Sequence, residues 1–218
     1  MKMKKMIYLL GMACVLLVGQ AGQAKSMKDM WLSMPDSLAP TLTQNMRLEM
    51  VELQDMKVKA EVANALGDSC VMDTLTHNFL QVQLSKVCLL QAKLLPTMGG
   101  DSILCVVKTF SGPEKESEVA FYNQDWQQKD AAHLFDGHDF ATLYDRLVQK
   151  PDTMSEERFA QLKSMIEPRM LNAILFEHDN SMVVRLALPL LSADDKKQVN
   201  AIKKQTKLNW SGRVFNEG

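Results

Sequence analysis

The densest group of residues that could do chemistry is the heptapeptide His-Leu-Phe-Asp-Gly-His-Asp that begins at His133. His133, Asp136, His138 and Asp139 supply two imidazoles and two carboxylates, which are ligand types that bind divalent metals. A five-residue step between the histidines does not place both on one helix face, because that needs a spacing of three or four. Gly137 is typical of a bend. We therefore interpret the segment as a polar turn in which Asp136 or Asp139 caps the next helix, and we assign no metal ligand.

Motifs for nucleophilic or phosphate chemistry are absent from the sequence. It contains no Gly-x-Ser-x-Gly elbow, Ser-x-x-Lys pair, glycine-rich phosphate loop, His-Glu-x-x-His or Cys-x-x-Cys. The carboxylate pairs Glu156-Glu157 and Asp194-Asp195 fall in the first turns of predicted helices, where negative charge is favourable to the helix dipole. We therefore assign no catalytic or cofactor-binding residue and expect no cofactor.

Three cysteines follow residue 24, namely Cys70, Cys88 and Cys105, and each lies in an apolar, strand-like segment. Free cysteine in such a place behaves as a small buried hydrophobe, and this is the interpretation we favour. An odd count leaves at least one thiol free or paired between molecules. One disulfide, or a thiolate that works with a distant histidine, are the alternatives.

Tyr122 and Trp126 lie where a predicted strand runs into a polar loop. Exposed tyrosine and tryptophan mark recognition surfaces, including platforms for sugars, but both residues more often anchor cores. We favour the core interpretation. Burial of both rings would remove this pointer to a binding surface.

The first 24 residues have the three parts of a cleavable signal peptide. Lysines precede residue 6, an apolar run follows from Met6 to Val18, and Gly22 and Ala24 occupy the −3 and −1 positions. Cleavage is predicted between Ala24 and Lys25. An uncleaved anchor is disfavoured because the apolar run is shorter than the roughly 20 residues that span a membrane. A lipid anchor is disfavoured because the residues before Cys14 do not form a lipobox.

Cleavage changes the charge balance. Residues 1–24 contain three lysines and no acid, so removing them from 25 basic and 26 acidic residues leaves 22 basic residues and a formal charge of −4. A nucleic-acid binder carries a clustered basic surface, and docking on anionic lipid needs a similar one. We therefore expect no nucleic-acid partner, and we find no transmembrane segment in the mature chain. Its predicted location is the periplasm, the cell surface or the extracellular space.

Periodicity places a helix at about 41–56 and a short helical lead-in before it. Alternating apolar residues then predict strands, at 69–75, 78–85, 87–95, 102–110 and 117–123. In the third of these, Gln91 and Lys93 point away from the apolar residues, which predicts a sheet with one covered face. The strand at 102–110 is apolar on both sides and is predicted to be central.

The helical period returns after Trp126. Helices are predicted near 140–148, from a capping box at Thr153 and Glu156, and from Ser192 to about 204. Strands are expected at 169–177, 181–188 and 206–215. This order predicts an α+β fold, with a mostly antiparallel sheet of about 7–8 strands and 4–5 helices packed on one face or between two lobes. We expect one domain over 25–218, within which two lobes, about 25–126 and 138–218, are compatible with the pattern.

Several stretches together resemble an uncharacterised family of exported proteins restricted to the Bacteroidales. These stretches cover roughly residues 30–210, and they include Met34-Pro-Asp-Ser-Leu-Ala-Pro40, Asn45-Met-Arg-Leu-Glu-Met50, Leu80-Gln-Val-Gln-Leu-Ser85, Lys93-Leu-Leu-Pro96, Asp101-Ser-Ile-Leu-Cys-Val-Val-Lys-Thr-Phe110 and Phe121-Tyr122. The resemblance implies a Gram-negative envelope protein of unknown function, and it carries over no catalytic residue.

These observations favour a soluble, exported, non-enzymatic protein that binds or scaffolds a component of the envelope, either a protein or a glycan. The alternative is a hydrolase-type enzyme whose site assembles from residues distant in sequence. A module that presents one sheet face as an inhibitor or chaperone is a third hypothesis. The sequence does not specify the oligomeric state.

Overall fold

The computed structural model describes residues 24–137 and 139–217. The predicted signal peptide, apart from Ala24, and His138 lie outside the described residues. The α-helices are α2 (Met27–Leu32), α3 (Gln44–Asp55), α4 (Tyr144–Leu147), α5 (Glu156–Ser164) and α6 (Ala193–Val199). Three 3-10 helices are η2 (Asp36–Leu38), η3 (Ala131–His133) and η4 (Phe140–Leu143). None of the helices in these residues has the length and apolar character that a membrane crossing requires.

The first sheet is an antiparallel meander of seven strands in chain order. Its strands are β1 (Ala60–Ala63), β2 (Ser69–Leu75), β3 (Phe79–Ser85), β4 (Cys88–Pro96), β5 (Ser102–Ser111), β6 (Lys115–Tyr122) and β7 (Gln128–Lys129). The five predicted strands are confirmed to within two residues. Strand β1 is not predicted by the sequence pattern, because its Ala-Glu-Val-Ala sequence contains a single β-branched residue. The loop at 97–101 joins β4 to β5, and Gly100 there takes the positive φ of +82° that glycine adopts without strain.

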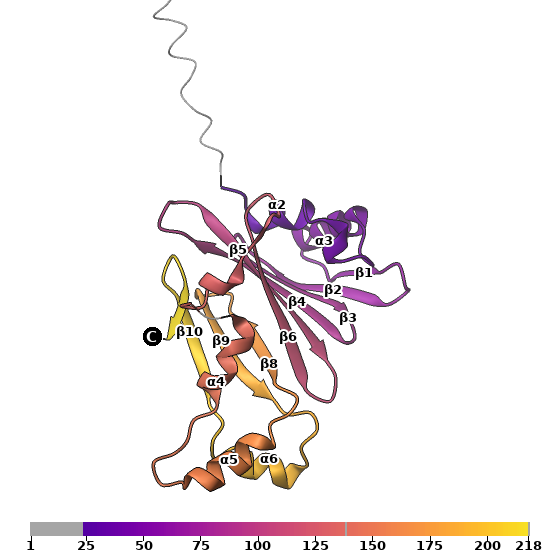
Figure 1. The fold of residues 1–218 in the computed structure, drawn as a ribbon. Coiled ribbons are helices and arrows are strands. Elements are labelled where there is room, and N and C mark those ends of the chain that lie inside the picture. Colours follow the sequence, from indigo (N-terminus) through magenta and orange to yellow (C-terminus); the bar gives the residue numbers. More distant parts are fainter. Residues whose placement is uncertain (1–23, 138, 218) are drawn as a thin grey trace, which may run out of the picture.

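Helices α2 and α3 cover one face of the first sheet (Figure 1). Thr43 caps α3 with a hydroxyl that accepts the Met46 N–H at 3.4 Å, so the helix begins three residues later than predicted. Met50 and Val51 of α3 pack with Trp31 of α2 in one apolar cluster. The predicted lead-in helix is confirmed as α2.

Arg47 of α3 is buried and ties together the segment between α2 and α3. Its guanidinium donates to Asp36 Oδ1 at 2.9 Å, to the Leu42 carbonyl at 2.8 Å and to the Met34 carbonyl at 2.6 Å. The Trp31 indole N–H donates to the Arg47 carbonyl at 3.1 Å. The irregular backbone between α2 and α3 is therefore held by one buried cation, and its charge is paired with Asp36.

The second sheet has four antiparallel strands in the order β11-β10-β9-β8. Its strands are β8 (Met170–Leu175), β9 (Ser181–Ala187), β10 (Gln205–Trp210) and β11 (Phe215–Glu217). Helices α5 and α6 lie at the end of the molecule away from α2 and α3 (Figure 1). The α+β class with antiparallel sheets is confirmed, since seven strands form one sheet and four more form the other.

Three local predictions in this region need correction. Ser155, not Thr153, caps α5, because its hydroxyl accepts the Arg158 N–H at 3.2 Å. The final strand predicted at 206–215 is a hairpin, because the chain reverses where Gly212 adopts φ +91°. The helix expected near 140–148 is a 3-10 turn followed by a four-residue α-helix. Ser192 caps α6 as predicted.

One apolar cluster joins the two sheets. It contains Cys105, Val107 and Phe121 from the first sheet and Ala173 and Val184 from the second. Strand β5 lies between β4 and β6 and is buried on both faces, as predicted. The division into lobes of 25–126 and 138–218 stays an interpretation, since residues of both meet in this cluster.

The prediction of a solvated face at β4 is wrong. Gln91 and Lys93 are only 5% and 1% exposed. Strand β8 is the edge of the second sheet, and the first sheet supplies side chains in place of a neighbouring strand. Gln91 bonds both the N–H and the carbonyl of Leu175, at 3.1 and 3.3 Å, and Lys93 Nζ donates to the Glu177 carbonyl at 2.6 Å. Polar residues alternate along β4 because they satisfy a buried backbone edge.

Candidate functional site

The residues at 133–139 do not converge on a site in the described part of the chain. His133, Asp136 and Asp139 are exposed, and no group of three potential ligands that could hold a metal occurs among the described residues. Asp139 occupies the N-cap position of η4, although its side chain makes no capping hydrogen bond. Asp136 adopts a positive φ of 54°, which agrees with the predicted bend.

The three cysteines are free thiols, and Cys70 and Cys105 are buried. Burial raises the pKa of the Cys105 thiol and, as the main cause, that of Cys70 and Cys88 as well. A raised pKa suppresses the thiolate that acts as the nucleophile. No hydrogen bond within residues 24–137 and 139–217 joins a histidine side chain to a cysteine or serine. The interpretation as buried hydrophobes is confirmed for Cys70 and Cys105.

Tyr122 and Trp126 belong to the core between the first sheet and its helices. Tyr122 is 8% exposed, Trp126 is half-buried, and their ring centroids are 5.4 Å apart. The Trp126 indole N–H donates to Ser33 Oγ at 3.3 Å, which ties the loop after β6 to α2. The core interpretation is confirmed for Tyr122. Trp126 packs against the same core but stays half-buried, so the condition that both rings be buried is met by Tyr122 alone.

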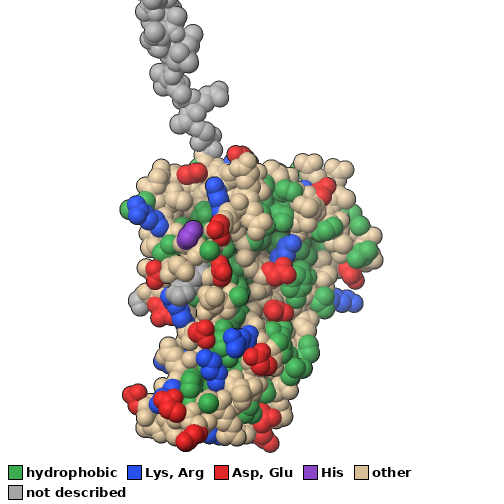
Figure 2. Space-filling view, in the orientation of Figure 1, with side chains coloured by type: hydrophobic (Ala, Val, Ile, Leu, Met, Phe, Trp, Pro, Cys, Tyr) green, Lys and Arg blue, Asp and Glu red, His purple; other side chains and the backbone are tan. Residues whose placement is uncertain are grey.

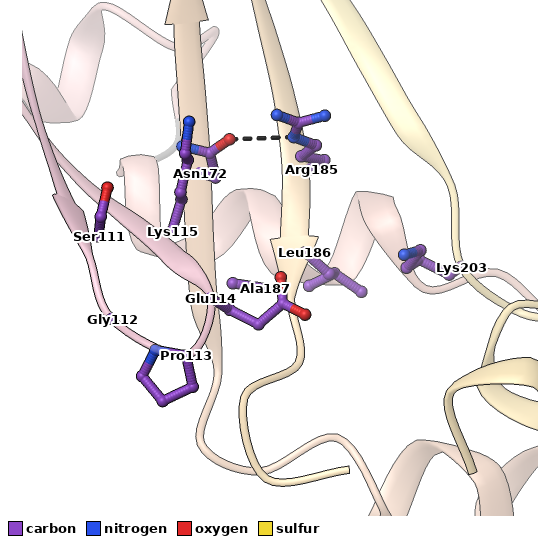
Figure 3. A pocket seen from close by; sticks show the side chains of 10 residues that line it. All are labelled: Ser111, Gly112, Pro113, Glu114, Lys115, Asn172, Arg185, Leu186, Ala187 and Lys203. Carbon is purple, nitrogen blue, oxygen red and sulfur yellow. Dashed lines mark hydrogen bonds between the residues drawn. The ribbon is translucent and has the colours of Figure 1, made fainter. Parts of the chain in front are cut away.

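A hollow of about 460 Å³ lies between the β5–β6 turn and the second sheet, and we call it the hairpin hollow (Figure 3). Four segments far apart in the sequence line it, and its residues are Ser111, Gly112, Pro113, Glu114, Lys115, Asn172, Arg185, Leu186, Ala187 and Lys203. Polar and charged side chains dominate this lining. Such a concave site with a few convergent polar groups is the usual form of a ligand site.

A chain of buried polar groups sets the position of Arg185 in this hollow. Arg185 Nε donates to Asn172 Oδ1 at 2.9 Å, and Asn172 Nδ2 donates to Ser117 Oγ at 3.0 Å. The Ser117 hydroxyl lies 2.9 Å from the Thr109 hydroxyl and also accepts the Ala173 N–H at 3.0 Å. Asn172 is 3% exposed. Because a guanidinium only donates, Arg185 bonds the amide oxygen of Asn172, and the amide nitrogen donates to Ser117.

The charges around the hollow are unequal. Lys115, Arg185 and Lys203 form no ion pair within the described residues, whereas Glu114 is paired with Lys196 at 2.6 Å. Lys115 and Arg185 extend toward one end of the hollow in Figure 3, and Glu114 lies toward the other. Elsewhere, acidic and basic side chains are interspersed over the face shown in Figure 2. The hollow is therefore a local concentration of positive charge.

Two smaller hollows share lining residues with this one. A hollow of about 140 Å³ shares Glu114, Leu186 and Lys203 with it, and another of about 360 Å³, next to residues 149–152, shares Lys203. Lys203 therefore lines all three hollows.

None of the residues that line the hairpin hollow is predicted from the sequence as a site residue. No motif contains the three cations Lys115, Arg185 and Lys203. A single charged residue in a strand or loop is normally interpreted as one that faces solvent. The one available signal was Asn172, a polar residue at the centre of an otherwise apolar strand. A buried amide in such a place needs partners, and it would have pointed to Arg185 opposite it in the antiparallel ladder.

Comparison with known proteins places the chain in a family. A family model described as "Protein of unknown function (DUF3256)" matches residues 20–215. The chain belongs to this family. Its membership confirms the resemblance, while the restriction to the Bacteroidales stays a prediction. Two stretches on which the resemblance rests, residues 34–40 and 45–50, are the ones that Arg47 links through Asp36 and the Met34 carbonyl.

One solved structure similar to this chain is entitled "Structure of a domain of an uncharacterized protein from Porphyromonas gingivalis W83". It superposes with a TM-score of 0.73 at 19% identity, and the alignment covers 90% of this chain and 100% of that one. At this identity the likeness shows a shared fold. No curated protein matches the chain.

Proposed function

We propose that this chain is an exported, non-enzymatic binding protein of the bacterial envelope, and that the hairpin hollow is where it takes its ligand. The single observation that supports the proposal is the polar chain from Thr109 to Arg185. A buried Asn172 amide and a Ser117 hydroxyl hold one exposed cation in a fixed orientation at the mouth of a cavity. Fixing a rotamer-rich side chain before binding lowers the cost of ordering it when a ligand arrives.

The nature of the lining favours binding over catalysis. Among the described residues, the only carboxylate that lines the hairpin hollow is Glu114, which is paired with a lysine. The only hydroxyl of that lining is Ser111, and no hydrogen bond among the described residues joins it to a histidine or a carboxylate that could activate it. The exported location is supported by the n-region, apolar run and small residues of the first 24 positions. The periplasm and the cell surface are both consistent with that signal.

Affinity capture tests the binding function. Residues 25–218 are immobilised and exposed to a detergent extract of the envelope of the bacterium that encodes the chain, and retained proteins and glycans are identified by mass spectrometry. Ser111→Trp fills the hollow and should abolish retention of a reproducible component. Ser164→Trp, a matched change at an exposed position on α5, should keep it. No reproducible component, or equal retention by both variants, would overturn the proposal.

Export is tested separately. Cell fractionation and N-terminal sequencing of the protein from the same bacterium should give a species that begins at Lys25 and is absent from the cytoplasm. A species that retains residues 1–24 would contradict cleavage.

A further inference from the structure

We infer, resting on the proposed function, that the ligand of the hairpin hollow presents a carboxylate and that Arg185 is the residue that recognises it. The first step is the charge of the lining. Three cations from three separate segments, Lys115, Arg185 and Lys203, face the hollow without an ion pair in the described residues. The chain as a whole has a formal charge of −1. Positive charge is therefore gathered at this one cavity in a chain that is not basic.

The second step is the orientation of the guanidinium. Because Arg185 Nε is committed to Asn172 Oδ1 at 2.9 Å, the plane of the group is fixed while its two Nη atoms have no hydrogen-bond partner within residues 24–137 and 139–217. Two parallel N–H donors in one plane match the two oxygens of a carboxylate. Figure 3 shows this group at the end of the hollow from which Lys115 also extends.

The third step separates a carboxylate from a phosphate. Glu114 also lines the hollow, and although Lys196 offsets its charge at 2.6 Å, its oxygens are acceptors that favour a donor group of the ligand over a further anionic oxygen. It is compatible with a single carboxylate beside a neutral or donor group. Lys203, shared with the adjoining hollows, extends the site toward the rest of such a ligand. A carboxylate of this kind occurs at the C-terminus of a peptide and in an acidic sugar, and the experiment tests each source separately.

The test titrates residues 25–218 with small carboxylates and follows the binding by ¹H–¹⁵N NMR. The peptide arm compares N-acetylalanine with its amide, and the sugar arm compares glucuronate with methyl glucoside, all at constant ionic strength and with inorganic phosphate as a further probe. At least one carboxylate should shift the Arg185 Nε signal and the backbone amides of residues 111–115 in a saturable way. Its neutral counterpart should not. The responding arm identifies the source.

Arg185→Gln should weaken binding of the responding carboxylate about tenfold to a hundredfold, the range for a charge-assisted bidentate pair. Arg185→Lys keeps the charge but loses the planar pair of donors, so its affinity for the carboxylate should lie between those of the unmodified chain and Arg185→Gln. Arg213→Gln is the matched control, because Arg213 is exposed and makes no ion pair in the described residues. It should bind like the unmodified chain.

Several results would overturn the inference. They are equal shifts by a neutral counterpart, tighter binding of phosphate than of any carboxylate, no response to any probe, or unchanged binding by Arg185→Gln. The binding function stands apart from these outcomes. If envelope capture is lost with Ser111→Trp but kept with Arg185→Gln, the hollow binds a ligand that is not recognised through this cation.

Discussion

Replacing Gln91 by leucine should destabilise the protein, although Gln91 lies on a strand face that alternation predicts to be solvated. The Gln91 amide bonds both the N–H and the carbonyl of Leu175 at the edge of β8. Leucine has nearly the same size but leaves both backbone groups buried without partners. The substitution therefore isolates the capping of the sheet edge from the filling of space.

The magnitude follows from these two groups. An unsatisfied buried backbone group costs about 1–3 kcal/mol, so the two together cost about 2–6 kcal/mol. The apolar leucine side chain returns about 1–2 kcal/mol through burial. We expect a net loss of about 2–3 kcal/mol in the free energy of unfolding. A substitution on a solvated strand face changes that free energy by at most about 0.5 kcal/mol.

Urea denaturation of residues 25–218, followed by far-UV circular dichroism, measures the difference. With a slope of about 2 kcal/mol per molar urea, the midpoint should fall by roughly 1 M. Gln81→Leu is the matched control, because Gln81 lies one strand away and contacts Gln91 but not β8. It should cost less than about 1 kcal/mol. A Gln91→Leu midpoint within experimental error of the unmodified chain, or equal to that of Gln81→Leu, would refute the capping role.

Three further predictions concern other buried polar groups. Arg47→Met should lower the free energy of unfolding in urea by about 3–5 kcal/mol, because it removes the guanidinium that donates to Asp36 and to the carbonyls of Leu42 and Met34. Asp36→Asn should lower it by about 1 kcal/mol, because the Asp36 side chain is 69% exposed, and equal losses would contradict this account. Burial lowers the pKa of Lys93, so the folded state loses that proton below the ordinary value of 10.5. The unmodified chain should gain stability relative to Lys93→Met as the pH rises toward 10.5, and a difference independent of pH would argue against it. The three thiols should label with a maleimide slowly at neutral pH and completely after unfolding without reductant; one fast native thiol, or fewer than three after unfolding, would contradict their state.

Strand positions were predictable because each strand carries its own signal. Alternation and the turn residues between 96 and 101 located β2 to β6, and the apolar character of both sides of β5 indicated its central place. The final hairpin was missed because Gly212 is a single glycine within an otherwise strand-like run. The capping box failed because Ser155, two residues on, offers the same hydroxyl chemistry as Thr153.

The hairpin hollow could not be predicted in the same way. Its parts, Lys115, Arg185 and Lys203, come from two sheets and a loop, and no local period relates residues that are distant along the chain. Asn172 and Ser117 are 55 positions apart, yet their hydrogen bond sets the orientation of Arg185. A polar residue in a strand has the same local pattern whether it meets water or a buried backbone edge.

By itself, the sequence determined the α+β class, the positions of β2 to β6, β8 and β9 and the family, because these depend on periodicity, turn chemistry and motifs along the chain. It also predicts export through its first 24 residues. Only the tertiary structure decided that eleven strands divide into two sheets and that Gln91 and Lys93 satisfy an edge instead of facing water. It also decided that three cations share one cavity. The physical reason is that pairing, burial and charge are properties of residues brought together by folding, and a linear pattern records each residue without its partners.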